Sequence, residues 1–328
     1  MALDPQAKAL LDAMAALPAL DFTQLTAPAY RAMLAAAGSL APGDAVASEE
    51  DLRIPTPNGS LAARVYRPVV AGGGNDALLP LTVFFHGGGF VSLGIDSHAN
   101  ICRCLAQRAQ TVVLSVDYRL APEAPFPAAA HDALDTVRWA ATHSAELRVR
   151  PGPLAVAGDS AGGNLAAVAA QQLRGDGTIA HQLLLYPVVD CATEHPSYES
   201  LATGYLLSAA QMRWFKDLYF GPDAGQADRA DPLASPLAAA LADLRGVASA
   251  TIVSAEFDPL RDEAEQYAAR LAQAGVPTAH VRWPGQIHGF ASLIGALDAA
   301  DHVLTHAAQA LHHALHVSPS RLRQPETT

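Results

Sequence analysis

A sharp turn between a strand and a helix is the feature that most constrains how this chain folds. Residues 154–157 are a short apolar run typical of a buried strand, and residues 161–173 have a helical pattern. Between them lies G-D-S-A-G at residues 158–162. In this pattern the serine occupies a tight turn that lifts its hydroxyl above the sheet edge, and the flanking glycines leave room for the turn. The motif therefore predicts an α/β architecture with Ser160 at the end of a strand.

The rest of the chain alternates between strand-like and helix-like segments. Most of the strand-like runs are almost continuously apolar, which is typical of strands covered on both faces of a parallel sheet. We therefore predict a mostly parallel, doubly wound sheet. The predicted strands are residues 61–66, 81–85, 111–118, 154–157, 182–185, 251–255 and 278–283, and the predicted helices are 98–108, 127–147, 161–173, 260–274 and 293–316.

Two regions fall outside this alternation. Residues 5–37 predict two short amphipathic helices broken by Pro18 and Pro28, and residues 191–241 contain helical pieces and turns but no strand pattern. Both could form a cap over the strand ends, where open α/β sheets hold their pockets. The expected organisation is N-terminal cap helices in 1–45, a core in 46–190 and 242–318, a cap insertion in 191–241, and a tail in 319–328. Residues 71–76 predict a surface loop.

Composition excludes several classes of function. The 32 acidic and 21 basic residues give a net charge of -11, which disfavours nucleic acid as a partner. The chain has no apolar run long enough for a membrane span and no signal peptide pattern at its N-terminus, so we expect a cytoplasmic protein. The three cysteines show no disulfide or zinc spacing and are expected to be reduced. We therefore expect neither a disulfide framework nor a zinc site.

A second glycine-rich segment, H-G-G-G at residues 86–89, follows the strand predicted at 81–85. Bare backbone amides can approach a carbonyl oxygen that becomes negative during acyl transfer, which is the role of an oxyanion hole. We expect the N–H groups of Gly88, Gly89 and Ala161 to form this hole. His86 is interpreted as a structural residue that braces the loop.

A serine nucleophile needs a base, and the base needs an acid. His288 is the candidate base because it follows the last predicted strand in a loop, whereas the later histidines fall in a helix. Asp258 is the preferred acid because it follows the strand at 251–255. Asp262 is the alternative, although a carboxylate in the first turn of a helix commonly only complements the helix dipole.

With these residues in place, the chain resembles the hormone-sensitive-lipase-like carboxylesterases of bacteria, which are α/β-hydrolases. The resemblance also covers D-Y-R-L-A-P-E at 117–123, D-P-L-R-D-E at 258–263 and H-G-F at 288–290. It implies an eight-stranded sheet with helices on both faces, a helical cap, no metal or cofactor, and hydrolysis of short to medium acyl esters. It also implies a possible homodimer through the strand at 278–283. Relatives often carry His-Asp where this chain has His98-Ala99, a position that we expect to concern packing or loop bracing rather than chemistry.

The sequence thus predicts a serine carboxylesterase that works on a small ester through an acyl-enzyme. Two alternatives stay open, namely amide or thioester hydrolysis by the same residues and a ligand receptor similar to the plant gibberellin receptors. Such receptors lack the catalytic histidine, whereas His288 is present. The candidate pocket residues, for which packing within the cap is an equal alternative, are Phe90, Leu206, Phe215, Ile287 and Phe290.

Overall fold

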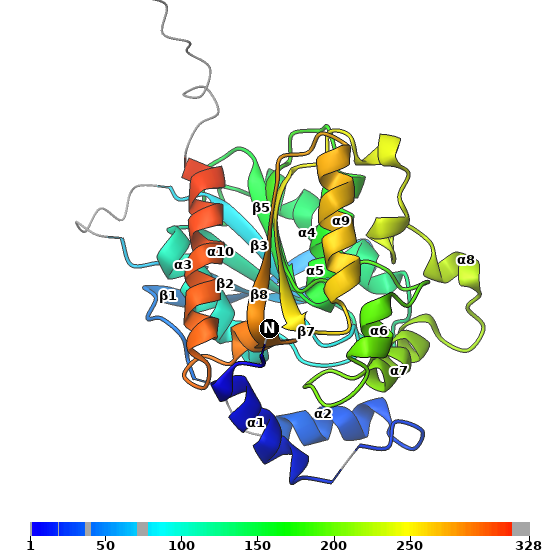
Figure 1. The fold of residues 1–328 in the computed structure, drawn as a ribbon. Helices are drawn as coiled ribbons and strands as arrows, with labels where there is room; N and C mark the ends of the chain where they lie inside the picture. The colour runs from blue at the N-terminus through cyan, green and yellow to red at the C-terminus, as the bar shows by residue number, and fades with distance from the viewer. Residues whose placement is uncertain (1, 19, 37–40, 71–77, 317–328) are drawn as a thin grey trace, which may run out of the picture.

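One sheet of eight strands organises the molecule (Figure 1). The computed structural model describes residues 2–18, 20–36, 41–70 and 78–316. The strands are β1 (Ser48–Thr56), β2 (Gly59–Arg67), β3 (Leu81–Phe85), β4 (Val112–Asp117), β5 (Leu154–Asp159), β6 (Ile179–Leu185), β7 (Ser249–Phe257) and β8 (Thr278–Ile287).

The strand order is β1-β2-β4-β3-β5-β6-β7-β8, with β2 antiparallel to both β1 and β4 and the other pairs parallel. This confirms the mostly parallel eight-stranded sheet, and each of the seven predicted strands overlaps one of β2 to β8. The exception is β1, which none of the seven predictions covers. Its side chains are mostly exposed, so it lacks the apolar run by which the other strands were recognised.

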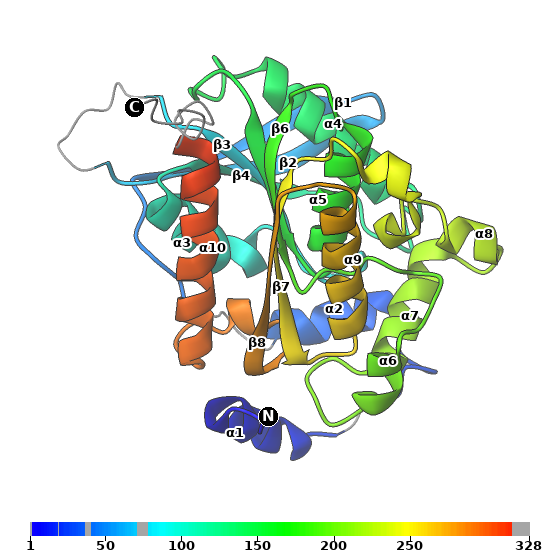
Figure 2. The same ribbon diagram turned by 45° about the horizontal axis from the view of Figure 1, so that its top comes forward.

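Helices cover both faces of the sheet (Figures 1 and 2). Phe84 and Phe85 are adjacent in β3 and fully buried, yet they belong to different hydrophobic clusters because successive side chains of a strand point to opposite faces. The helices on one face are α3 (Ala99–Ala109) and α10 (Asp298–His316), and those on the other are α4 (Ala128–Thr142), α5 (Ala161–Gln172) and α9 (Arg261–Gln273).

The remaining helices lie near the ends of the parallel strands. Figure 1 shows α1 and α2 beyond the arrowhead of β7, next to α6 and α7. Asp4 caps the N-terminus of α1. Pro28 was predicted to break a helix, but it lies in the first turn of α2, where a helix tolerates proline. These helices are α1 (Pro5–Ala15), α2 (Ala27–Ala36), α6 (Pro196–Ser200), α7 (Ala209–Phe220) and α8 (Gln226–Arg229).

Short 3-10 helices complete the chain. The helix predicted over 293–316 begins only at Asp298, and the 3-10 helix η4 (Phe290–Ser292) precedes it. The other short helices are η1 (Asp96–His98), η2 (Pro236–Ala238) and η3 (Leu241–Leu244). The predicted loop at 71–76 and the predicted tail at 319–328 lie outside the described residues.

The three cysteines are free and buried, as expected from their spacing. No helix in the described part of the chain is both long and apolar enough to cross a membrane.

Candidate active site

Ser160 stands between β5 and α5 with a backbone conformation that non-glycine residues rarely adopt, φ 53° and ψ -118°. The turn is tight because the neighbouring backbones touch. A Cβ atom on Gly158 would lie 2.3 Å from the carbonyl carbon of Gly162, and one on Gly162 would lie 1.9 Å from the carbonyl oxygen of Phe85. Both glycines of the G-D-S-A-G motif are therefore needed for steric reasons.

The structure brings Ser160, His288 and Asp258 together in one line. The Nε2 atom of His288 lies 3.0 Å from the Oγ atom of Ser160, and its Nδ1 atom lies 2.7 Å from Oδ2 of Asp258. Ser160 is 7% exposed, His288 9% and Asp258 0%. This geometry lets the imidazole accept the serine proton while the carboxylate orients the ring.

Asp258 and Asp262 have different partners. The Oδ1 atom of Asp258 accepts a hydrogen bond of 2.9 Å from the backbone N–H of Leu260, which holds its other oxygen toward His288. Asp262 accepts from the backbone N–H of Ser197 and from the side chain of Arg261, at 2.9 Å each. Of the two candidate acids, only Asp258 contacts the imidazole.

The glycine loop at residues 87–89 contacts Asp159, the residue before Ser160, since the backbone N–H of Gly87 donates to Oδ1 of Asp159 at 2.9 Å. Gly88 and Gly89 have positive φ angles of 115° and 63°. A Cβ atom on Gly88 would lie 2.0 Å from the carbonyl oxygen of Ser92, and one on Gly89 would lie 2.3 Å from the ring of Phe215. The third expected donor, Ala161, is the first residue of α5, where free N–H groups and the helix dipole favour negative charge.

The predicted pocket residues take different places. Phe215, on α7, packs on Gly89, and Leu206 approaches Gly289 beside His288. Phe90 stacks on Tyr219 with ring centroids 3.9 Å apart. Ile287 and Phe290 are fully buried in the cluster that contains α3 and α10. A pocket-lining role stays a prediction for all five residues.

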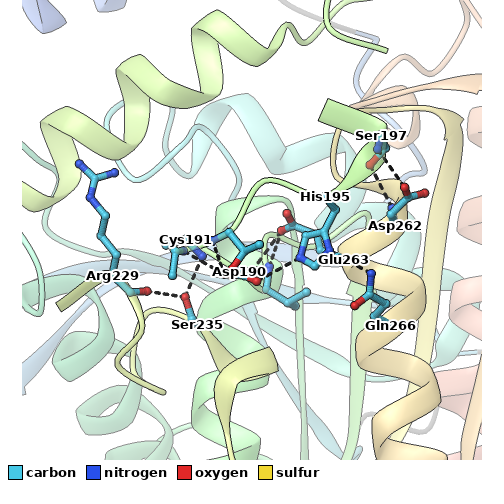
Figure 3. A network of polar contacts seen from close by, with 12 residues as sticks. Asp190, Cys191, His195, Ser197, Arg229, Ser235, Asp262, Glu263 and Gln266 are labelled. Atoms are coloured by element: carbon cyan, nitrogen blue, oxygen red, sulfur yellow. Dashed lines mark hydrogen bonds and ion pairs between the residues drawn. The ribbon is translucent and has the colours of Figure 1, made fainter. Parts of the chain in front are cut away.

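A network of polar contacts joins the start of α9 to the segment that follows β6 (Figure 3). Glu263 accepts hydrogen bonds from the backbone N–H groups of Val189 and Asp190, at 2.8 and 3.3 Å. The hydroxyl of Ser197 donates to the carbonyl oxygen of Pro259, at 2.5 Å, next to Asp258. The segment 189–197 is thus fastened to the loop that carries Asp258.

Glu263 predicts a pH dependence of stability. Burial raises its pKa from 4.5 to about 7, although Lys216 acts in the opposite direction. At pH values between 4.5 and about 7, Glu263 keeps its proton in the folded protein and loses it in the unfolded chain. The contribution of Glu263 to the free energy of unfolding therefore falls as pH rises. Glu263→Gln cannot ionise and retains an acceptor for Val189. Urea unfolding should therefore show a smaller loss of stability from pH 5 to pH 8 in the variant, by about 1 to 3 kcal/mol. Equal losses in both proteins would contradict the prediction.

Sequence reasoning gave no role to three residues that surround the glycine loop. Asp159 lies within the G-D-S-A-G motif and Tyr118 within D-Y-R-L-A-P-E, and the His98-Ala99 position was expected to serve packing or loop bracing without a chemical role. Asp159 accepts from the N–H of Gly87, and Tyr118 donates to the carbonyl oxygen of His86. The available signal was that Asp159 directly precedes a candidate nucleophile.

No group of three or more histidine, cysteine, aspartate or glutamate side chains within the described ranges is arranged to hold a metal ion. The protein groups present around Ser160 are its own hydroxyl, the imidazole of His288, the carboxylate of Asp258 and backbone amides.

Comparison with known proteins agrees with this geometry. Residues 82–292 match a family described as having the alpha/beta hydrolase fold. The chain belongs to this family. The resemblance drawn from the motifs is confirmed, since the relatives of this α/β hydrolase include esterases of bacteria and archaea.

One relative is the carboxylic ester hydrolase LipN of Mycobacterium tuberculosis, which is 44% identical over 251 residues. That match covers 74% of this chain but only 64% of LipN. The ethyl acetate hydrolase of Pseudomonas putida is 39% identical, and the match covers 80% of this chain and 81% of the relative.

Among solved structures, the hyperthermophilic esterase from the archaeon Pyrobaculum calidifontis superimposes on this α/β hydrolase with a TM-score of 0.86. Its sequence is 36% identical, and the match covers 95% of this chain and 98% of that structure.

Proposed function

We propose that this α/β hydrolase is a serine carboxylesterase that cleaves short to medium acyl esters through an acyl-enzyme. The observation that carries the proposal is the hydrogen-bonded line from Asp258 through His288 to Ser160, with distances of 2.7 and 3.0 Å. The glycine loop is joined to the residue before Ser160 by the hydrogen bond from Gly87 to Asp159. Relatives named as carboxylic ester hydrolases and esterases support the same chemistry.

In the proposed mechanism His288 takes the proton of Ser160 as the serine oxygen attacks the ester carbonyl. The N–H groups of Gly88, Gly89 and Ala161 stabilise the negative oxygen of the tetrahedral intermediate. His288 then gives its proton to the departing alcohol, and the acyl group remains on Ser160. A water molecule attacks this acyl-enzyme in the same way and releases the acid.

Hydrolysis of p-nitrophenyl esters of increasing acyl length tests the proposal, with Ser160→Ala as the inactive control. We expect turnover of the short and medium esters by the wild type only. Matched anilide and thioester substrates test the two alternative leaving groups. Tight binding of a small ligand without hydrolysis of any ester would contradict the proposal and favour a receptor.

We also propose that the segments 1–45 and 191–241 act as a cap over a core formed by 46–190 and 242–318. Contacts between α2 and α7 support this division. The hydroxyl of Tyr30 accepts a 2.8 Å hydrogen bond from Gln211, and its ring lies 5.3 Å from that of Trp214. The indole N–H of Trp214 donates to the carbonyl oxygen of Leu25.

Phe215 offers a prediction about acyl length. Its ring fills the space beside Gly89, so Phe215→Ala should open room next to the oxyanion loop. We expect the ratio of kcat/KM for octanoate over butyrate esters to rise about tenfold, which corresponds to about two further methylenes buried at about 0.8 kcal/mol each. Phe220→Ala, on the same helix but packed against Phe126, is the matched control. The same change in ratio for both variants would exclude a specific role for Phe215.

A homodimer through β8 remains a proposal. β8 is the last strand in the sheet order and pairs with β7 on one side, so its other edge could pair with a second copy. Light scattering after size-exclusion chromatography would distinguish a dimer from a monomer.

A further inference from the structure

Asp159 is a buried carboxylate next to the nucleophile that the proposed mechanism does not use. It is 5% exposed, and its Oδ1 atom accepts a 2.9 Å hydrogen bond from the backbone N–H of Gly87. The Nε2 atom of His98 lies 3.1 Å from Oδ1 and 3.3 Å from Oδ2. A buried carboxylate is costly unless it is paired and hydrogen-bonded, and these two partners meet that need.

The hydrogen bond to Asp159 fixes the first peptide group of the glycine loop. The N–H of this group belongs to Gly87, and its carbonyl oxygen belongs to His86. That oxygen accepts a 2.8 Å hydrogen bond from the hydroxyl of Tyr118. Both polar ends of the peptide group are therefore held by buried side chains, so the group cannot rotate without losing two hydrogen bonds.

The next two peptide groups are fixed through their carbonyl oxygens. The oxygen of Gly87 lies 2.7 Å from Nδ1 of His86, and burial lowers the pKa of His86 to about 3, so the ring is neutral and Nδ1 carries its proton. The oxygen of Gly88 accepts from the N–H and hydroxyl of Ser92, each at 3.0 Å. The peptide group with the carbonyl of Gly87 carries the N–H of Gly88, and the group with the carbonyl of Gly88 carries the N–H of Gly89. The orientations of both expected oxyanion donors are therefore fixed.

We propose that Asp159, held by His98, is a positioning residue that sets the oxyanion hole by anchoring the N–H of Gly87. The inference rests on the proposed esterase mechanism and adds a residue to it. Asp159 touches no reacting atom and acts only through the loop.

The fit between Asp159 and Gly87 supports this role. A Cβ atom on Gly87 would lie 2.6 Å from Oδ2 of Asp159, so the carboxylate closely approaches the loop backbone. Burial opposes ionisation of Asp159, but His98 and the Gly87 amide outweigh it and hold the pKa of the carboxyl below its usual range. An ionised acceptor forms a stronger hydrogen bond than a neutral one, so ionisation of Asp159 strengthens its hydrogen bond with the N–H of Gly87.

Asp159→Ala and Asp159→Asn test the proposal. Alanine removes the carboxylate and leaves the Gly87 N–H only the more distant Nε2 of His98, at 3.3 Å, whereas asparagine retains a weaker, neutral acceptor. For a p-nitrophenyl ester we expect kcat to fall about 10- to 100-fold in the alanine variant and by an intermediate factor in the asparagine variant, with KM within about twofold of the wild type. A trifluoromethyl ketone, whose adduct with Ser160 places an oxyanion in the hole, should bind more weakly by the same factor as kcat falls.

Asp132→Asn is the matched control, because Asp132 is also a buried carboxylate, but its hydrogen-bond partners are the backbone N–H and the guanidinium of Arg119 and not the glycine loop. It should leave both kcat and ketone affinity unchanged. The proposal is overturned if Asp159→Ala retains both values, or if kcat falls while ketone affinity does not. If the alanine variant does not fold, the asparagine variant decides: parallel falls of at least threefold support the proposal, and unchanged values overturn it. A wild type that hydrolyses no ester would instead refute the proposed function.

Discussion

Ser160→Ala is expected to lower kcat for ester hydrolysis by about a millionfold, to the residual rate that binding and the oxyanion hole alone can supply. The hydroxyl is the one nucleophile that lies 3.0 Å from His288 Nε2 in this site, and alanine leaves no atom to form the acyl-enzyme. Steady-state hydrolysis of p-nitrophenyl butyrate would measure the loss. Mass spectrometry after treatment with a fluorophosphonate should show labelling of the wild type and none of the variant.

Two controls separate lost chemistry from lost folding. His288→Ala should cost about as much as Ser160→Ala, and the double variant little more, because residues that act as one unit are not additive. The melting temperature should stay near that of the wild type, since alanine keeps the unusual backbone conformation of Ser160. Retention of more than about one per cent of the activity by Ser160→Ala would show that another group is the nucleophile.

The sheet could be predicted because strands that are buried on both faces have nearly continuous runs of apolar residues. β3 and β5 are buried along their length, and apart from Thr82, Gly158 and Asp159 all of their residues are apolar. β1 follows a different rule. It lies at the edge of the sheet and exposes most of its side chains, so no apolar run distinguishes it from a loop.

The convergence of the candidate site could also be predicted, because parallel strands bring their carboxyl ends to one edge. Ser160 follows β5, Asp258 follows β7 and His288 follows β8. Contacts made by α7 and by inward-facing side chains could not be predicted in this way. Phe215 lies on α7, far from Gly89 in the sequence, yet its ring packs on Gly89. Asp159, at the end of β5, accepts a hydrogen bond from Gly87, which follows the neighbouring strand β3. Such contacts depend on how whole segments pack against one another, and the spacing of motifs along the sequence gives no information about this packing.

Replacing Asp258 by asparagine should distinguish the two candidate acids. An amide can donate a hydrogen bond to Nδ1 of His288, which leaves the ring proton on Nε2 and prevents that atom from accepting the proton of Ser160. We expect Asp258→Asn to lower kcat by about 10,000-fold. The fold should persist, because the amide oxygen can still accept from the backbone N–H of Leu260.

Asp262→Asn is the matched control, since both carboxylates belong to the same D-P-L-R-D-E segment. Asp262 holds the N–H of Ser197 and the guanidinium of Arg261, so asparagine should change kcat by less than about tenfold and act mainly on stability. Measuring kcat and the melting temperature for both variants separates the two effects. A larger loss of kcat in Asp262→Asn would transfer the role of the acid to that residue, and equal losses would mean that the loop between β7 and α9 acts only as a scaffold for His288.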